Sequence, residues 1–359
     1  MILFIAKTLI VFTLSYLLSG VSASCVDVSR YYQIYDDILS LATSIDNDID
    51  RSHFYGGIVR LVAHDFMDYD QSSSDPMGMD GCIDWIHEAN AGLSSIWNEH
   101  TDLYKLHETK YSDISRPDFW IIAANAVIYH TSIDNSLDLI NTFYWGRKER
   151  NECLGSAQRL PHASSQEVRS SCQQVEDVFL TRMGLTWKDA VALMGAHTLG
   201  CGHAQFSGHH GTWASDDRQA QIFDKQYYQE LLGRAWSPRQ VSVSPPIQDW
   251  SSTQINSGSP KMMLNTDMCL VYNLEKTKFP CCTRTDLRGR CMTLGNVQCE
   301  RYDRDDDYYK ATEAVLKYMQ GTENNFHDNT NFYEAFRLAW YKATMNSVDD
   351  LQYIVASCS

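Results

Sequence analysis

Apolar residues recur at helical spacing along most of the chain. Residues 57–67 carry them three and four apart, and residues 119–129 form a long apolar run behind a helix-start pattern at 115–118. Thr186 and Asp189 have the spacing of a capping box, which predicts a helix that Gly200 would stop. This pattern predicts a mainly helical, all-α fold.

Two stretches break the helical pattern. Residues 236–260 are rich in Ser, Pro and Gly and predict a loop. Residues 281–299 hold four cysteines, inside a Cys-rich excursion of about 272–300. Disulfide bonds are the first interpretation of these cysteines. A zinc site is the alternative, disfavoured because paired Cys-x-x-Cys spacing is absent.

The N-terminus predicts a targeting segment. Residues 1–23 hold one lysine, Lys7, in an apolar run that ends in small residues, which is typical of a secretory signal. An uncleaved anchor helix is the alternative, although the run is shorter than a membrane span. We therefore expect secretion, with residues 24–359 as one domain. The chain has 11 cysteines, an odd number, so at least one must stay free or pair with another chain.

The chain is acidic, with a formal net charge of −15. Binding to a phosphate backbone needs a basic surface, so we expect no nucleic-acid partner. An acidic surface also disfavours anionic membranes, and we expect no membrane association once the signal has been cleaved.

Three segments carry candidate chemistry. Arg60 and His64 lie four residues apart, so one helix face presents both. Such a pair suits peroxide cleavage, because the imidazole moves a proton and the guanidinium stabilises charge. His197 could ligate haem iron, with Asp267 as the carboxylate behind it. Taken singly, these residues also fit a solvated helix face, a core histidine and a turn aspartate.

In combination, the segments resemble the plant-type haem peroxidase superfamily. The matching stretches are Gly56–Asp65, Leu185–Gly200, Ile222–Leu231 and Met262–Asp267. The resemblance runs from about residue 29 to about residue 340. It implies a two-lobed helical fold with haem b between the lobes, and hydrogen peroxide plus a small-molecule donor as substrates.

The resemblance also implies roles for individual residues. His197 falls at the proximal iron ligand and Asp267 at its carboxylate partner. Arg60 and His64 fall at the distal acid–base pair, and Asn90 at the residue that orients the distal histidine.

On the proximal side, the chain is similar to ascorbate and cytochrome c peroxidases. Residues 208–213 match that branch's Gly-x-x-Gly-Pro-Trp with Thr212 in place of proline. Trp213 would then lie beside His197, at the position that carries a radical in cytochrome c peroxidase. A large core aromatic is the alternative role for Trp213.

On the distal side, the chain resembles secreted fungal and plant peroxidases, which hold calcium with oxygen ligands. The resemblance places a distal calcium at Asp65, Gly78, Asp80 and Cys82, where Cys82 replaces a serine of the family. It places a second, proximal cation at Thr198, Asp216, Ile222 and Asp224.

Several positions depart from the family and limit the donor. Ala63 replaces the aromatic residue that precedes the distal histidine. Phe206 replaces the arginine that binds ascorbate, His53 and Gly57 replace manganese ligands, and Ala192 replaces an exposed tryptophan of lignin peroxidases. These departures leave a small phenolic or aromatic donor by default.

The function expected from the sequence is therefore a secreted haem peroxidase that oxidises its donor by one-electron steps. The alternative is a catalytically weak structural or adhesive protein on a peroxidase scaffold, which Ala63 and the Cys-rich excursion motivate. A calcium-dependent binding module without haem is a third interpretation.

Overall fold

The computed structural model describes most of the chain from residue 25 onward. The described residues are 25–162, 170–243, 246–252, 259–276, 280–288, 290–292, 297–346 and 348–358. The signal segment expected over residues 1–23 lies outside them. No helix among the described residues has the length and apolar character needed to cross a membrane.

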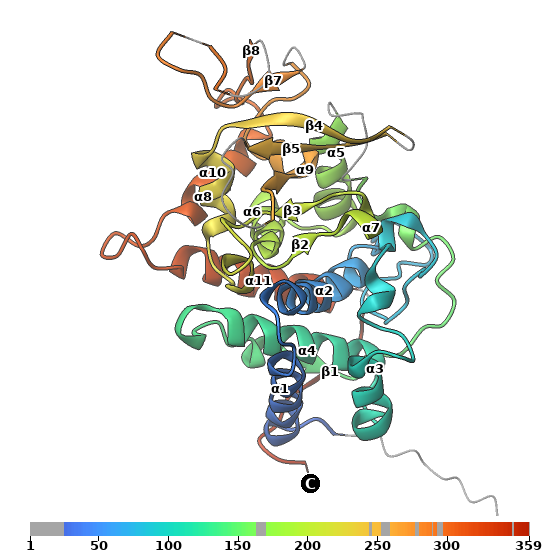
Figure 1. Cartoon of the computed structure of the whole chain (residues 1–359). Coiled ribbons are helices and arrows are strands. Elements are labelled where there is room, and N and C mark those ends of the chain that lie inside the picture. The colour runs from blue at the N-terminus through green and yellow to red at the C-terminus, as the bar shows by residue number, and fades with distance from the viewer. Residues whose placement is uncertain are drawn as a thin grey trace, which may run out of the picture.

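The fold is mainly helical, which confirms the expected fold class (Figure 1). The helices are α1 (Val28–Thr43), α2 (Asp48–Phe66), α3 (Asp102–Leu106), α4 (Arg116–Thr131), α5 (Ser171–Val175), α6 (Trp187–Met194), α7 (Ala204–Ser207), α8 (Gln226–Gly233), α9 (Asn265–Met268), α10 (Tyr309–Met319) and α11 (Thr330–Met345). Short 3-10 turns join them, including η1 (Glu88–Asn90), η9 (Gly195–Thr198) and η10 (Gln219–Gln221).

Most of the described strands are only two residues long, and β4 and β5 are the longer ones. They are β1 (Tyr144–Trp145), β2 (Cys201–Gly202), β3 (Gly211–Thr212), β4 (Trp236–Val243), β5 (Pro246–Ser252), β6 (Met262–Met263), β7 (Cys281–Cys282), β8 (Val297–Gln298) and β9 (Gln352–Tyr353). The loop predicted over residues 236–260 is wrong in large part, because β4 and β5 pair there as an antiparallel hairpin. The fully buried side chains of Trp236 and Trp250 anchor this hairpin, and their burial outweighs the polar composition around them.

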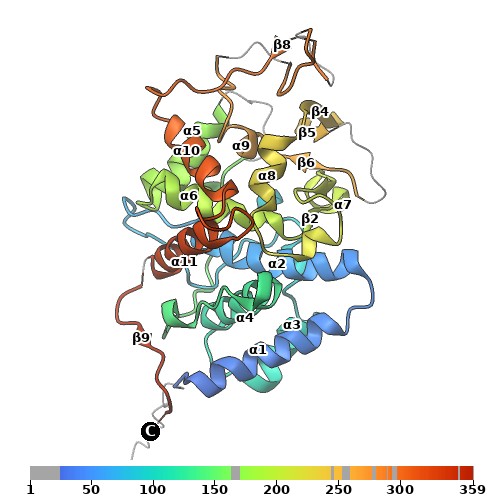
Figure 2. The same ribbon diagram turned by 90° about the vertical axis from the view of Figure 1, so that its left-hand side faces the viewer.

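The helices form two groups on either side of α2. In Figures 1 and 2, α1, α3 and α4 lie on one side of α2, while α6, α8 and α10 lie on the other. Helix α4 packs against both α1 and α2, and α6 packs against both α10 and α11. Helix α2 therefore runs along the boundary between two lobes.

Local sequence explains where the two site-bearing helices begin. Helix α2 starts at Asp48, nine residues before the predicted start, because the Asn47 side chain caps it by accepting from the Asp50 N–H over 2.8 Å. Helix α6 starts as predicted, since Thr186 accepts from the Asp189 N–H over 3.3 Å and the Asp189 carboxylate accepts from the Thr186 N–H over 3.0 Å.

Two glycines let α2 touch the turn that follows His197. A Cβ added to Gly56 would lie 2.8 Å from the Cα of Gly200, which is closer than real Cβ atoms approach. Gly200 also has a φ of +79°, a backbone conformation that favours glycine. This contact brings the helix of Arg60 and His64 against the segment of His197.

Ten of the eleven cysteines form five disulfide bonds. The pairs are Cys25–Cys358, Cys82–Cys153, Cys172–Cys269, Cys281–Cys299 and Cys282–Cys291. The disulfide interpretation of the Cys-rich excursion is confirmed over the zinc alternative. Cys201 is the free cysteine that the odd count required.

Candidate active site

Arg60 and His64 face one another across a turn of α2, as predicted. The Nε of Arg60 donates to Nε2 of His64 over 3.2 Å. The other end of the guanidinium donates to the carbonyls of Ala91 at 2.9 Å and Ala89 at 3.0 Å. The loop around η1 thus fixes the guanidinium in place beside the imidazole.

Asn90 orients the distal imidazole, also as predicted. Nδ1 of His64 lies 2.8 Å from Oδ1 of Asn90, whose amide nitrogen donates to the Asp84 carbonyl over 3.0 Å. Arginine has no acceptor atom, so Nε2 of His64 must accept from Arg60. In that tautomer the proton sits on Nδ1 and points at Asn90, which leaves Nε2 as the basic atom.

Burial keeps the distal histidine neutral. Burial, followed by the charge of Arg60, lowers the pKa of His64 to about 3. Burial also lowers the pKa of Arg60 to about 10, so its guanidinium stays charged at neutral pH. The site therefore holds a neutral base next to a fixed positive charge.

The proximal group is built around the buried carboxylate of Asp267. Nδ1 of His197 lies 2.8 Å from Oδ1 of Asp267, and the Trp213 indole N–H donates to Oδ2 over 2.7 Å. The Trp213 ring stacks on the His197 ring at 4.5 Å between centroids and 21° between planes. Trp213 thus lies beside His197 and bonds Asp267, as the resemblance implied.

Tyr227 is a member of this group that the sequence did not single out. Its hydroxyl donates to Oδ1 of Asp267 over 2.8 Å, and the Leu264 N–H donates to Oδ2 over 2.7 Å. Burial alone would raise the pKa of Asp267, but the charge and hydrogen bond of His197, together with the hydrogen bonds from the Leu264 N–H and the Trp213 indole, hold it below its usual range. Burial and the charge of Asp267 raise the pKa of Tyr227, so it remains a neutral donor.

The two groups fit the faces of a bound haem. Nε2 of His197 makes no hydrogen bond among the described residues, and its side chain is 32% exposed although Asp267 behind it is fully buried. Ala63, His64 and Trp213 are likewise only partly buried, beside fully buried neighbours. His197 is also close enough for its charge to lower the pKa of His64, behind burial and Arg60. An imidazole nitrogen without a hydrogen bond, near an acid–base pair, is a donor set that suits haem iron.

A buried histidine nitrogen without a hydrogen-bond partner could bind a propionate carboxylate of haem. Nδ1 of His203 is buried and has no hydrogen-bond partner among the described residues. A carboxylate placed there would accept from it. Nearby, Nε2 of His53 lies 3.3 Å from the Cys201 sulfur, and the His53 and His203 rings are 5.0 Å apart.

The expected cation ligands come together only in part. Cys82 is bonded to Cys153, so the prediction of Cys82 as a calcium ligand is wrong. Thr198 donates to the Ile222 carbonyl over 3.3 Å and to the Asp224 carboxylate over 3.2 Å. No group of three or more His, Cys, Asp or Glu residues within the described ranges is placed to hold a metal ion.

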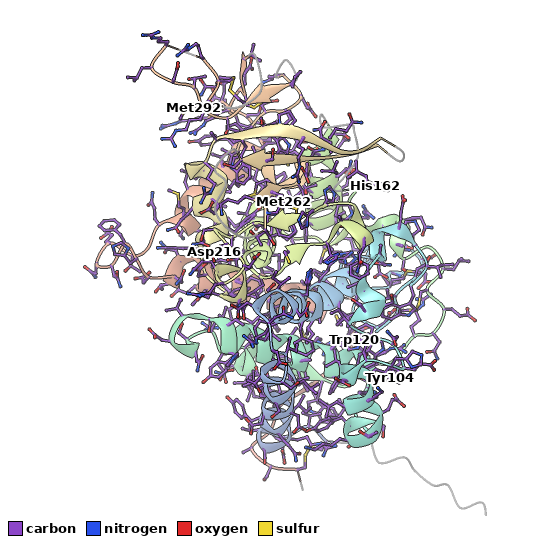
Figure 3. All side chains as sticks on the ribbon, viewed as in Figure 1. Tyr104, Trp120, His162, Asp216, Met262 and Met292 are labelled. Carbon is purple, nitrogen blue, oxygen red and sulfur yellow. A yellow bond between two sulfur atoms is a disulfide. The ribbon has the colours of Figure 1, made fainter. Side chains whose placement is uncertain are left out.

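Asp216 is not joined to the proximal group of oxygens by a hydrogen bond among the described residues. Its carboxylate accepts from the N–H groups of Arg218 at 3.0 Å and Gln219 at 2.9 Å, which open η10. Figure 3 labels Asp216 in the loop that follows β3. Asp216 therefore caps a turn in this structure.

A family model described as peroxidase matches residues 41–279 of the chain. The chain belongs to this family. The match covers all of the distal and proximal residues described above, and it agrees with the resemblance to plant-type haem peroxidases.

Relatives of this peroxidase are similar over different shares of its length. L-ascorbate peroxidase 3 of Arabidopsis thaliana is 34% identical over 179 residues, which is 49% of this chain and 55% of the relative. Mitochondrial cytochrome c peroxidase of Aspergillus fumigatus is 26% identical over 299 residues, or 81% of this chain and 69% of the relative. The mitochondrial cytochrome c peroxidase of Candida albicans is 29% identical over 253 residues, which is 67% of this chain and 61% of the relative. The chain thus spans little more than half to about two thirds of these relatives.

The comparisons contradict the expected secretion of this peroxidase. The cytochrome c peroxidases of Aspergillus fumigatus, Candida albicans and Neurospora crassa are all named as mitochondrial. The expectation rested on residues 1–23, which the structure does not describe, and we withdraw it.

Proposed function

We propose that this chain is a haem peroxidase that reduces hydrogen peroxide and oxidises a small donor by one-electron steps. The observation that carries the proposal is the neutral His64, held between Asn90 and Arg60, with the Asp267-bonded His197 near enough for its charge to lower the pKa of His64. A scaffold without catalysis would not need a guanidinium bonded to a neutral imidazole in this way.

On the proximal side, Nε2 of His197 would hold the haem iron, and Asp267 would accept from Nδ1. This hydrogen bond makes the ligating imidazole more basic. The bound haem supplies the electrons that cleave the O–O bond of peroxide.

On the distal side, the protein moves one proton. Nε2 of His64 accepts the proton from one peroxide oxygen and returns it to the other, which leaves as water. The Arg60 guanidinium, fixed by the Ala89 and Ala91 carbonyls, stabilises the negative charge that develops on the departing oxygen. Asn90 keeps the proton of His64 on Nδ1, so that Nε2 carries the lone pair that takes up the peroxide proton.

For the donor, we propose a small phenol. Phe206, at the position of the ascorbate-binding arginine, is 39% exposed and packs against His203 at 5.3 Å between ring centroids. Ala63 leaves the distal side of the site without the bulky ring that its relatives have there. An open, partly aromatic edge suits an uncharged ring better than an anion.

Turnover of the haem-loaded protein tests this proposal. We expect the protein to bind one haem and to oxidise small phenols only when peroxide is present. The exposed His210 provides a matched control, since His210→Gln should keep this activity while His197→Gln should lose it. Failure to take up haem, or haem uptake without peroxide-dependent oxidation, would favour the scaffold alternative.

The pH dependence follows from the state of His64. Free histidine is protonated below about pH 6.5, but the pKa of about 3 keeps His64 neutral well below that. The rate constant for reaction with peroxide should therefore stay level from about pH 8 to about pH 5 and fall only near pH 3–4. Rapid mixing, with circular dichroism to detect acid unfolding, measures this. If the rate constant fell with a midpoint near pH 6.5 while the protein stayed folded, the lowered pKa of His64 would be contradicted.

The Tyr227 hydroxyl should raise the reduction potential of the bound haem. Without this donor, Asp267 would draw the Nδ1 proton of His197 more strongly, and a more basic imidazole favours ferric iron. We expect Tyr227→Phe to lower the reduction potential by roughly 20–60 mV. This shift corresponds to a modest fraction of the free energy of one hydrogen bond to a charged group. Spectroelectrochemical titration measures it, with Tyr104→Phe as a control outside the proximal group. An unchanged or higher potential would contradict this role.

A further inference from the structure

The loop that follows His64 does not present the ligands that a distal calcium requires. This segment, residues 65–82, is called the distal loop here. Both carboxylate oxygens of Asp65 accept backbone N–H groups, from Gly81 at 2.8 Å and Cys82 at 3.1 Å. The Gly78 carbonyl accepts from the Asp80 N–H over 2.7 Å. Hydrogen bonds within the loop thus hold these atoms in place without an ion.

The other two expected ligands, Cys82 and Asp80, each interact with a residue outside the loop. Cys82 is covalently bonded to Cys153, which removes the side chain that stands in for the family's serine hydroxyl. One oxygen of Asp80 accepts from the Cys82 N–H over 3.1 Å, and the other faces the Arg150 guanidinium at 4.0 Å. A positive charge of the protein therefore already stands beside Asp80.

A second guanidinium bonds the middle of the distal loop. Nη1 of Arg159 donates to the carbonyls of Asp68 and Pro76, each over 2.9 Å. Nη2 of the same residue donates to the Ser73 hydroxyl at 3.2 Å and the Asp75 carbonyl at 3.0 Å. One arginine thus joins four positions of the loop, as a cation bound by carbonyl oxygens would.

Arg150 fastens the same loop at its outer edge. Nη1 of Arg150 donates to the Asp75 carboxylate over 2.7 Å, and the Arg150 N–H donates to the Asp80 carbonyl over 3.0 Å. Arg116 lies behind it, because its Nη2 donates to the Arg150 carbonyl over 2.8 Å. Guanidinium groups therefore stand beside Asp75 and Asp80 and place positive charge next to these two carboxylates.

One buried carboxylate oxygen of this region has no hydrogen-bond partner among the described residues. Oδ2 of Asp68 is that atom, while Oδ1 accepts from the Gly78 N–H over 2.8 Å. Calcium takes six to eight oxygen ligands, and the Cys82–Cys153 disulfide removes one side-chain ligand of the expected set. The residues therefore do not fit the calcium site that the family resemblance implied.

We propose that this peroxidase dispenses with the distal calcium and holds the distal loop with the Cys82–Cys153 disulfide and the guanidinium groups of Arg150 and Arg159. The segment around residues 150–159 takes over the role of the ion by clamping the loop from outside. Asp65 directly follows His64, so this clamp also holds the end of the helix that carries the distal base. The inference concerns the loop itself and does not rest on the proposed activity.

Calcium content and thermal melting of the full-length, haem-loaded protein test this proposal. After calcium is added and unbound ions are removed, elemental analysis should find far less than one calcium per chain. The melting temperature should be the same in excess calcium and in the chelator EGTA. One retained calcium per chain, or a melting temperature that EGTA lowers, would overturn the proposal.

Substitution of the clamp gives a second readout. Arg159→Gln should lower the melting temperature by roughly 3–8 °C, equally with calcium and with EGTA, because four hydrogen bonds weaken. Arg290→Gln, at an arginine whose side chain is 70% exposed, should leave it unchanged. Full stability of Arg159→Gln would also overturn the proposal, and if that variant fails to fold, the calcium measurements on the unaltered protein still decide it.

Discussion

Replacement of His64 by leucine should slow the reaction with hydrogen peroxide by at least about 10²–10⁴-fold, the range that general acid–base catalysis supplies. Leucine fills a similar volume but cannot carry the proton between the peroxide oxygens. Arg60 would keep its bonds to the Ala89 and Ala91 carbonyls, but its Nε would lose the acceptor that Nε2 of His64 provides. Stopped-flow absorbance at several peroxide concentrations gives the second-order rate constant for this comparison.

Two further variants distinguish the loss of proton transfer from a general loss of protein structure. His100→Gln, at a histidine whose side chain is 85% exposed, should react like the unaltered protein. Asn90→Ala should slow the reaction less than His64→Leu, because the imidazole remains but loses the acceptor that fixes its tautomer. An unchanged rate constant in His64→Leu would remove His64 from the mechanism.

Loss of Arg147 should lower the free energy of unfolding by about 3–5 kcal/mol, the cost of leaving one partner of a buried ion pair alone. Nη1 of Arg147 donates to Oδ1 of Asp118 over 2.7 Å, and the two side chains are only 1% and 3% exposed. Nη2 of Arg147 also donates to the Thr344 carbonyl over 2.8 Å, which ties α4 to the end of α11. Arg147→Met would leave the Asp118 carboxylate buried with only its backbone donors, the N–H groups of Gly146 and Arg147.

Chemical denaturation of Arg147→Met measures this loss. The matched control is Arg290→Met, because Arg290 and Asp286 form an exposed pair, and such pairs contribute about 0–1 kcal/mol. The double variant Asp118→Asn with Arg147→Met should recover part of the stability, since no lone charge would remain buried. Equal effects of Arg147→Met and Arg290→Met would contradict the account of the buried pair.

The distal and proximal groups could be predicted from the sequence because each rests on local or motif-level signals. Arg60 and His64 are one helical turn apart, so any helix through them presents both on one face. The capping-box spacing of Thr186 and Asp189 predicted the helix that leads to His197, and the structure contains that capping box. The pairing of His197 with Asp267 came from the family resemblance, not from spacing, since 70 residues separate them.

Other features depend on tertiary contacts that leave no local signal. Tyr227 carries its role only because α8 places its hydroxyl against Asp267. The β4–β5 hairpin was misread because the burial of Trp236 and Trp250 outweighs the Ser- and Pro-rich composition around them. The carboxylates at Asp65 and Asp80 match a calcium motif, yet Arg150, which lies 70 positions after Asp80, and Arg159, which bonds the Asp68 carbonyl from 91 positions away, hold the same loop.

The central claim is that this chain cleaves hydrogen peroxide at a haem held by His197. The most direct test mixes the purified, haem-loaded protein with one equivalent of peroxide and records the Soret band on the millisecond timescale. We predict a fast shift of the band that is complete at one equivalent and reversed by a phenolic donor. A spectrum that stays ferric, or that bleaches slowly without an intermediate, would contradict the claim.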